Sequence, residues 1–192
     1  MKKLFFAAII AVFAMTSVNA QTFGVKAGLN LANLTGDIDN NKALTSFHVG
    51  AVAEFEISDE FSFQPELVYS AQGTHFKYSE DLGGGNSIDV DYKTNLSYLN
   101  LPLMAKYEVS EGISLLAGPQ IGFLMSAKSD GNDIKDSMKG IDFGVNLGAA
   151  YELESGMFFD LRYNIGLSNI ADSNNVTIKN SVLSVSLGYK FN

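Results

Sequence analysis

Cysteine and tryptophan are absent from this chain of 192 residues, and proline occurs only three times. Without cysteine the chain has neither a disulfide scaffold nor thiol chemistry. Basic residues are also scarce, 13 against 21 acidic ones, and the net charge of −8 argues against a nucleic-acid partner, which needs clustered lysine and arginine. After residue 20 no run of about 18 apolar residues occurs, so the sequence predicts no transmembrane helix there.

The first 20 residues have the pattern of a secretory signal peptide. Two lysines are followed by the wholly apolar run Leu4–Met15. As a helix this run would rise about 18 Å, which is short of the roughly 30 Å hydrocarbon core of a membrane. Small side chains then precede a predicted cleavage between Ala20 and Gln21. The sequence therefore predicts a signal peptide over residues 1–20 and one mature domain over residues 21–192.

Eight segments of the mature domain alternate apolar and polar residues with a period of two, which is the pattern of β-strands with one apolar face. Upstream of the fourth segment, residues 90–96 alternate with the opposite parity. Because one extra residue moves every later side chain to the other face, this change predicts a β-bulge near Ser97. The eight segments are 23–31, 47–57, 61–71, 98–109, 113–126, 141–153, 157–168 and 183–192.

The connections between these segments alternate in length. Short turns on one side and long loops on the other, with an even number of strands, are typical of antiparallel barrels that span a membrane. The tight turns are 58–60, 110–112 and 154–156, and the long polar loops are 35–45, 74–89, 128–140 and 169–179.

The polar face of the strands decides between a soluble β-protein and a membrane barrel. A soluble barrel would also alternate, but with its apolar face inside. The interior of an eight-stranded barrel is only wide enough to be filled by side chains, and glycine, serine, amides and charges suit that space. The bulky apolar face must then point outward, where water would make it an aggregation-prone patch. The sequence therefore predicts an all-β, eight-stranded antiparallel up-and-down transmembrane β-barrel, with periplasmic termini and extracellular long loops.

The ends of the strands agree with an outer-membrane location. The last strand alternates apolar residues up to the aromatic Phe191, as in outer-membrane insertion signals, and it departs from them in that Asn192 follows this aromatic residue. Aromatic side chains also recur near the short turns, and they predict an aromatic girdle at the periplasmic interface. These residues are Tyr107, Tyr151, Phe159 and Tyr189.

Several segments resemble one known family. The opening strand 24–31 with Gly36–Asp37, the segment Tyr98–Tyr107 (YLNLPLMAKY), Gly118–Pro119 and the closing residues 187–191 are similar to PorT-like, porin-family outer-membrane β-barrel proteins. The resemblance covers the whole mature chain and implies a small eight-stranded barrel of the OmpA/OmpX type. It brings no catalytic residues, and one type in the family assists protein secretion.

Ten charged residues share the inward parity. An ion path or proton relay would use such residues, but paired charges would also simply fill the lumen, because unpaired buried charges are costly. We expect a self-neutralising plug with Arg162 and Lys106 as its central cations. Asp142 is also inward, near the other end of the barrel. The predicted lumen cluster is Lys26, Glu54, Glu56, Glu66, Lys106, Glu108, Glu152, Asp160, Arg162 and Lys190.

Motifs for metals and catalysis are weak. Asp37, Asp39 and Asn41 imitate the first ligands of a calcium loop, but the required glycine and glutamate are missing, which leaves open only a loose surface cation site. His48 near the outer mouth and His75 in the second long loop have no local catalytic signature. Gly83–Gly85 lacks the lysine and helix of a phosphate loop. We therefore expect no cofactor, metal or catalytic site.

The sequence predicts an outer-membrane protein with a structural or interaction role, carried by a filled barrel and four long surface loops. The best candidate contact surface is the second loop, flanked by Phe76, Tyr78 and Tyr92. Expected partners are outer-membrane lipid and lipopolysaccharide, the barrel-assembly machinery and an unknown protein. The alternatives are a narrow pore for small solutes and, more remotely, a lipid-modifying enzyme.

Overall fold

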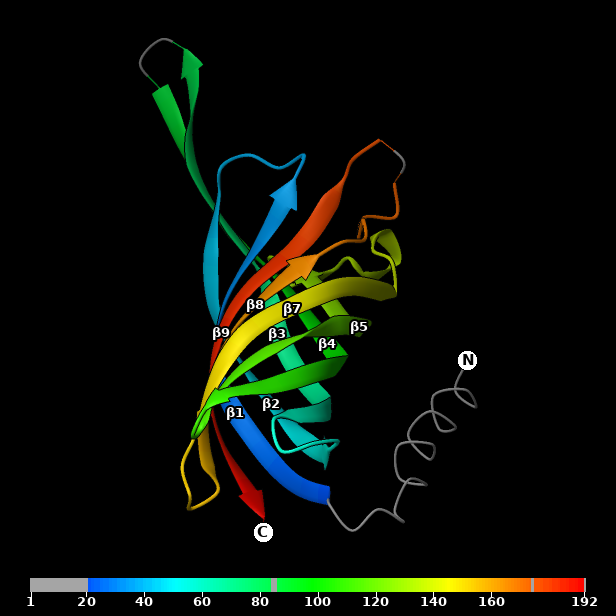
Figure 1. The fold of residues 1–192 in the computed structure, drawn as a ribbon. Helices are drawn as coiled ribbons and strands as arrows, with labels where there is room; N and C mark the ends of the chain where they lie inside the picture. The colour runs from blue at the N-terminus through cyan, green and yellow to red at the C-terminus, as the bar shows by residue number, and fades with distance from the viewer. Residues whose placement is uncertain (1–20, 84–85, 174, 192) are drawn as a thin grey trace.

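Eight long antiparallel strands form the ring of the molecule (Figure 1). The computed structural model describes residues 21–83, 86–173 and 175–191. The predicted signal peptide, residues 1–20, lies outside these residues. The strands are β1 (Gln21–Gly36), β2 (Asn41–Glu56), β3 (Phe61–Gly83), β4 (Asn86–Ser110), β5 (Ile113–Ser129), β7 (Ile141–Glu152), β8 (Met157–Gly166) and β9 (Ile178–Phe191), with the two-residue β6 (Asn132–Asp133) and the 3₁₀ turn η1 (Lys135–Ser137) after β5.

The ring closes because its first and last strands pair with each other. Neighbours along the chain pair in antiparallel register from β1 to β5, then β5 pairs with β7, and so on to β9. β9 returns to β1, from Phe23 opposite Phe191 to Gly36 opposite Ile178. The closed ring leaves no unpaired strand edge around the barrel, which is what a sheet needs inside a hydrocarbon layer. The all-β, eight-stranded, up-and-down prediction is confirmed.

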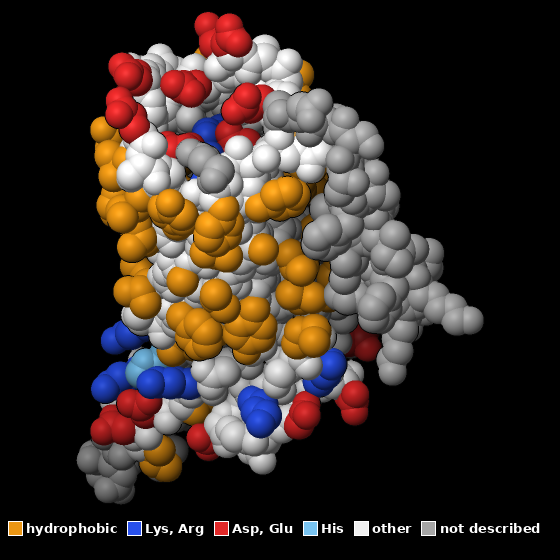
Figure 2. Space-filling model, turned by 90° about the horizontal axis from the view of Figure 1, so that it is seen from below, with side chains coloured by type: hydrophobic (Ala, Val, Ile, Leu, Met, Phe, Trp, Pro, Cys, Tyr) orange, Lys and Arg blue, Asp and Glu red, His pale blue; other side chains and the backbone are white. Residues whose placement is uncertain are grey.

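The apolar face of each strand points outward. β8 alternates strictly between exposed and buried residues along its whole length, with Leu161 52% exposed and Arg162 5% exposed. Figure 2 shows the outward side chains as an apolar band, with charged side chains beyond both of its edges. The four predicted girdle aromatics are all exposed near the short turns. No helix in the described residues is long and apolar enough to span a membrane.

Two of the four predicted long loops are mostly strand. β1 and β2 extend so far that only residues 37–40 connect them, and the predicted loop 74–89 is largely a hairpin formed by the outer parts of β3 and β4. This hairpin projects beyond the barrel (Figure 1). Polar residues form strands here because the ladder hydrogen bonds continue from the barrel, so the end of an apolar pattern does not mark the end of a strand.

The bulge predicted near Ser97 lies in the partner strand instead. β4 pairs with β3 without a shift from Thr94 to Asn100. Against β5, however, Ser97 lies opposite Ser126 while Tyr98 lies opposite Leu124, so the extra residue is Met125 of β5. β4 therefore keeps one parity, and Leu96, which the sequence pattern placed on the outer face, points into the lumen.

Candidate functional site: a charged and capped lumen

Four charged side chains meet in the middle of the lumen. Arg162 of β8 bonds both carboxylate oxygens of Glu66 across the barrel, with Nη1–Oε2 at 2.9 Å and Nη2–Oε1 at 3.0 Å. Asp160, two residues before Arg162 on the same face, also accepts from this guanidinium. The Lys26 ammonium lies 2.7 Å from Glu66 Oε2 and 3.6 Å from Asp160 Oδ2. This central network therefore holds two cations and two anions, and the fork geometry fixes Arg162 in place.

A second set of four charges lies nearer the short turns. Lys106 Nζ lies 2.9 Å from Glu54 Oε1 and 2.9 Å from Glu152 Oε2. Lys190 Nζ contacts the same two carboxylates, at 2.6 Å from Glu152 and closer still to Glu54. Lys190 also lies 5.8 Å from the centre of the Phe158 ring. This turn-side network is neutral as well, so each ammonium removed from water is compensated by two carboxylates.

The structure brings together eight of the ten predicted cluster residues and leaves two outside. Glu56 and Glu108 have the inward parity, but both are exposed at the strand ends. Glu108 accepts a hydrogen bond from the Gly112 backbone in the adjoining turn. Parity specifies the face of a strand but not the depth along it, so it could not separate these two residues from Glu54 and Lys106, which lie one step deeper.

His48 joins a serine and an asparagine in the lumen. Asn30 Nδ2 donates to the Phe47 and Ala71 carbonyls, at 3.2 and 2.8 Å, so Asn30 Oδ1 must be the atom that faces His48 Nδ1 at 2.8 Å. His48 Nδ1 therefore donates, and Nε2 lies 2.9 Å from Ser186 Oγ. The residue types match a hydrolase triad, but all three side chains are buried.

The space beside these residues is small. A cavity of about 40 Å³ lies among Lys26, Asn30, His48, Gln72 and Arg162, which is enough for a few water molecules but not for a lipid chain. Gln72 Oε1 has no hydrogen-bond partner among the described residues. The lumen beside these residues is therefore a polar interior with a pocket large enough for a few water molecules.

A family comparison agrees with this geometry. Residues 19–172 match the model of the outer membrane protein beta-barrel domain. The chain belongs to this family. Like its structural relatives, it is therefore a protein of the bacterial outer membrane, and its apolar band faces lipid. Comparison with curated proteins gave no match.

Solved outer-membrane barrels have the same fold at low sequence identity. Neisserial surface protein A is 18% identical with a TM-score of 0.58, over 88% of this chain and 97% of that one. Ail of Yersinia pestis, solved with the heparin analogue sucrose octasulfate, is 16% identical with a TM-score of 0.53, over 90% and 99% of the two chains. A major outer membrane protein of Thermus thermophilus is 14% identical with a TM-score of 0.51, over 90% and 100%.

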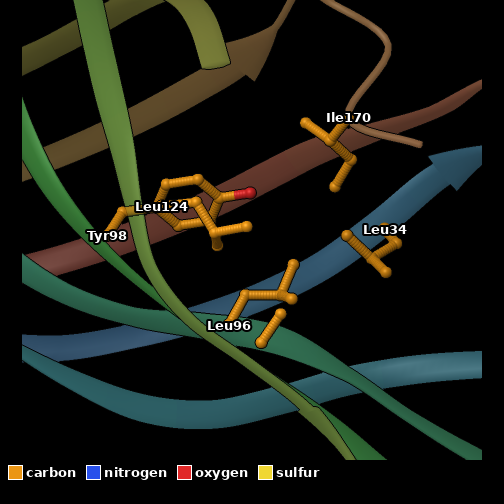
Figure 3. Close-up of a cluster of buried hydrophobic side chains, with 6 residues drawn as sticks. Leu34, Leu96, Tyr98, Leu124 and Ile170 are labelled. Atoms are coloured by element: carbon orange, nitrogen blue, oxygen red, sulfur yellow. The ribbon is translucent and has the colours of Figure 1, made fainter. Parts of the chain in front are cut away.

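An apolar cap that the sequence did not reveal lies inside the hairpin end of this outer-membrane barrel. Leu34 of β1, Leu96 and Tyr98 of β4, Leu124 of β5 and Ile170 of the segment after β8 converge in the mouth (Figure 3). Leu96, Tyr98 and Ile170 are each 0% exposed. Ala127 completes this cap, and Ile38, Ile134, Met138 and Ile178 pack against it. These apolar residues on the lumen side pack together as a small hydrophobic core does.

The outer hairpin carries its own contacts beyond the cap. Phe76 and Tyr92 are cross-strand partners whose rings stack with centroids 4.8 Å apart. His75 Nε2 lies 2.6 Å from Asp91 Oδ1, and Lys77 lies 3.5 Å from the other carboxylate oxygen. The hydrogen bond with His75 holds the pKa of Asp91 below its ordinary value, helped by the positive charges of His75 and Lys77. The base of the predicted contact surface is therefore a two-stranded ribbon whose side chains contact each other across the strands.

Asp37 and Asn41, two of the residues that imitate calcium ligands in the sequence, form hydrogen bonds with backbone groups in the structure. Asp37 N–H donates to the Thr177 carbonyl at 2.8 Å, and Asp37 Oδ2 accepts from the Thr177 backbone at 2.9 Å. Asn41 donates to the Leu34 carbonyl. Among the described residues, no three acidic or histidine side chains converge in a way that could hold a metal ion. Asp37 therefore joins the first connection to the last one. Of Gly83–Gly85, only Gly83, the last residue of β3, is described.

Proposed function

We propose that this outer-membrane barrel is an interaction protein, in which a sealed barrel presents the β3–β4 hairpin to partners outside the cell. The projection of this hairpin beyond the ring is the observation that carries the proposal (Figure 1). β2 pairs with β3 only as far as Phe76, and β5 pairs with β4 only from Thr94. Beyond these residues the described part of the ribbon has no ladder pairing with β2 or β5, and single backbone hydrogen bonds join Lys77 to Asn40 and Lys93 to Asp130.

The barrel interior supports a structural role rather than transport. Two neutral ion networks and an apolar cap lie one above the other in the lumen, and the cavity beside the central network measures about 40 Å³. The second candidate is a narrow pore for small solutes, and conductance separates it from the first. The plug role of the eight networked residues is part of this proposal.

An enzymatic role is the remote alternative, and we propose that the protein is not an enzyme. Ser186 is 2% exposed and His48 5% exposed, so a lipid ester has no route to the pair. His48→Ala would abolish lipid modification in a barrel enzyme, whereas here it removes only two lumen hydrogen bonds.

The route to the membrane and the finer family assignment belong to the same proposal. Residues 1–20 would direct export, and the barrel-assembly machinery would insert the mature chain, whose last strand ends in the aromatic Phe191. The segment Tyr98–Tyr107 supports a PorT-like member of the family. Lipopolysaccharide would surround the hairpin end. Ail was solved with an anionic heparin analogue, and by analogy an anionic ligand would also suit this chain.

Deletion of residues 79–87 tests the contact role. The shortened protein and the full protein, both epitope-tagged, are cross-linked in intact cells and purified in detergent. We expect a partner that is captured by the full protein and lost from the deletion variant. Retention of every partner would exclude the hairpin as the contact surface.

A further inference from the structure

Three basic side chains form a row across neighbouring strands at the outer edge of the apolar band. Lys42 of β2 lies directly opposite His75 of β3, and His75 lies directly opposite Lys93 of β4. Directly opposed residues share a face, and their neighbours Thr74 and Thr94 are buried toward the lumen. The row Lys42–His75–Lys93 therefore points outward, away from the barrel axis.

This arrangement is electrostatically unfavourable without an anion. Basic residues directly opposite each other in a sheet destabilise it, because their Cβ atoms lie only about 5 Å apart. Among the described residues, Asp91 is the one carboxylate that contacts the row. Its two oxygens lie within salt-bridge distance of His75 and Lys77. Within the described part of the chain, neither the Lys42 nor the Lys93 ammonium has a carboxylate within salt-bridge distance. Two cations of the row are therefore available to an external anion.

The two edges of the apolar band differ in charge. The exposed charges of the three short turns and adjoining strand ends are all acidic in the described chain: Glu56, Asp59, Glu60, Glu108, Glu111 and Glu154. Every described lysine outside the lumen lies at the hairpin end. Acidic residues lie there too, on the connecting segments 37–40 and 130–136, at Asp172 and on the hairpin itself (Glu80, Asp81, Asp89 and Asp91), so the hairpin end differs from the short-turn end in carrying lysine and not in lacking acids. Figure 2 shows lysine and histidine side chains gathered just beyond one edge of the band.

The row also continues the lipid-facing surface. Below it on β3 and β4 come two outward pairs of small or polar residues, Gly73–Asn95 and Ala71–Ser97, and then the pair Tyr69–Leu99 of the apolar band. Tyr69 packs near Phe47 of β2, with ring centroids 6.0 Å apart. Lysine at such an edge can lay its aliphatic stem on the apolar surface and hold its ammonium at the level of the lipid head groups. An anion bound here would therefore be attached to acyl chains that lie along the band.

We propose that Lys42, His75 and Lys93 form a binding site for the phosphate of an outer-leaflet lipid, whose acyl chains pack on the adjoining apolar band. The site rests on the proposed orientation of the barrel but not on the hairpin's protein contacts. The lipid would therefore bind specifically to one side of the barrel, at strands β2–β4.

A lipid titration tests this site. The protein is refolded in phosphatidylcholine nanodiscs with an increasing fraction of lipid A, and amide shifts of residues 42, 75 and 93 are followed by NMR. The variant K42Q/K93Q removes both free ammonium groups. The matched control K139Q/K179Q removes the same charge from two lysines outside the row. Lipid A without its phosphates and inorganic phosphate alone are the two ligand controls.

We expect saturable shifts with lipid A and half-saturation at an about tenfold or higher fraction in K42Q/K93Q, because each lysine near a lipid surface contributes appreciably to anionic lipid binding. The control variant should bind lipid A as the unchanged protein does. Equal binding by K42Q/K93Q would overturn the proposal, as would equal binding of lipid A without phosphates. Saturation by inorganic phosphate, with no further effect of lipid A, would overturn the lipid assignment. Failure here leaves the hairpin proposal intact, because no protein partner enters the experiment.

Discussion

Arg162 is the residue on which the central network depends. It bonds Glu66 through two nitrogens and also contacts Asp160, so its removal would leave two carboxylates with the single cation Lys26. Breaking a buried ion network by removing one partner costs about 3–5 kcal/mol. We expect Arg162→Met to lower the free energy of unfolding by that amount, measured by urea titration in lipid vesicles with circular dichroism.

Two further variants test whether the loss of stability in R162M comes from the ion network. Glu108→Gln changes a residue with the same parity that lies outside the networks, and it should leave stability within about 0.5 kcal/mol. The double variant R162M/E66Q removes one cation and one anion, so it should be more stable than R162M alone. If R162M were as stable as E108Q, the network would contribute no stability.

The Asp91 carboxylate on the outer hairpin should titrate at unusually low pH. Its hydrogen bond to His75 depresses its pKa, so the contact stabilises the hairpin above the ordinary carboxylate range and is lost as the pH falls through the depressed pKa. We expect His75→Asn to move the Asp91 midpoint upward, as followed by carboxyl carbon NMR. An unchanged midpoint would mean that the hydrogen bond has no electrostatic effect.

The strands show which structural features the alternating sequence pattern predicts and which it misses. The period-two pattern gave the number of strands and their outward faces, because lipid selects apolar residues at every second position. It failed at Leu96, where an apolar residue faces the lumen in the cap, and the bulge at Met125 of β5 left no sign in the sequence of β4. The pattern also placed the outer limits of β2 and β3 at the edge of the apolar band, although the ladder hydrogen bonds of both strands continue beyond that edge.

The β8–β9 pair depends on a close contact between a ring and a glycine. Phe158 lies opposite Gly188, and a Cβ at Gly188 would lie 2.1 Å from the Phe158 ring. We expect Gly188→Ala to cost about 1–3 kcal/mol, by the same unfolding measurement, because the buried ring has little room to move. Gly140→Ala is the matched control, since a Cβ there meets nothing within 4 Å. The double variant F158L/G188A should recover part of the loss, and failure to recover would place the strain elsewhere.

The outer hairpin should be separable from the barrel as a folding element. Deleting residues 79–87 removes no pairing with β2 or β5, and shortening a loop changes its closure entropy only slightly. We expect the free energy of unfolding to stay within about 1 kcal/mol of the unchanged protein. A large loss would show that the ribbon supports the barrel, and would weaken its use as a test of partner binding.

For the molecule as a whole, the candidate site was only partly visible in the sequence. Inward parity identified the eight charges that form the two networks, because buried charges need opposite partners and the pattern supplies both signs. It could not give depth, which separates Glu56 and Glu108 from the others. The Asn30–His48–Ser186 contacts and the row Lys42–His75–Lys93 depend on strand register, which joins residues far apart in the sequence.

The proposed closure of the lumen at three levels predicts the electrical behaviour of the barrel. In the proposed plug, the apolar cap closes the mouth, the central network closes the middle, and the turn-side network closes the end near the short turns. In planar bilayers we expect no stable open channel from the unchanged protein, nor from the cap variant L124A/I170A, nor from the neutral lumen variant E66A/R162A. Only these four substitutions combined with loss of the turn-side network (E54A/K106A/E152A/K190A) should give measurable current, because water and ions then meet none of the three barriers. A stable open pore in the unchanged protein would refute the plug, and current in the cap variant alone would show that the central network does not block ions.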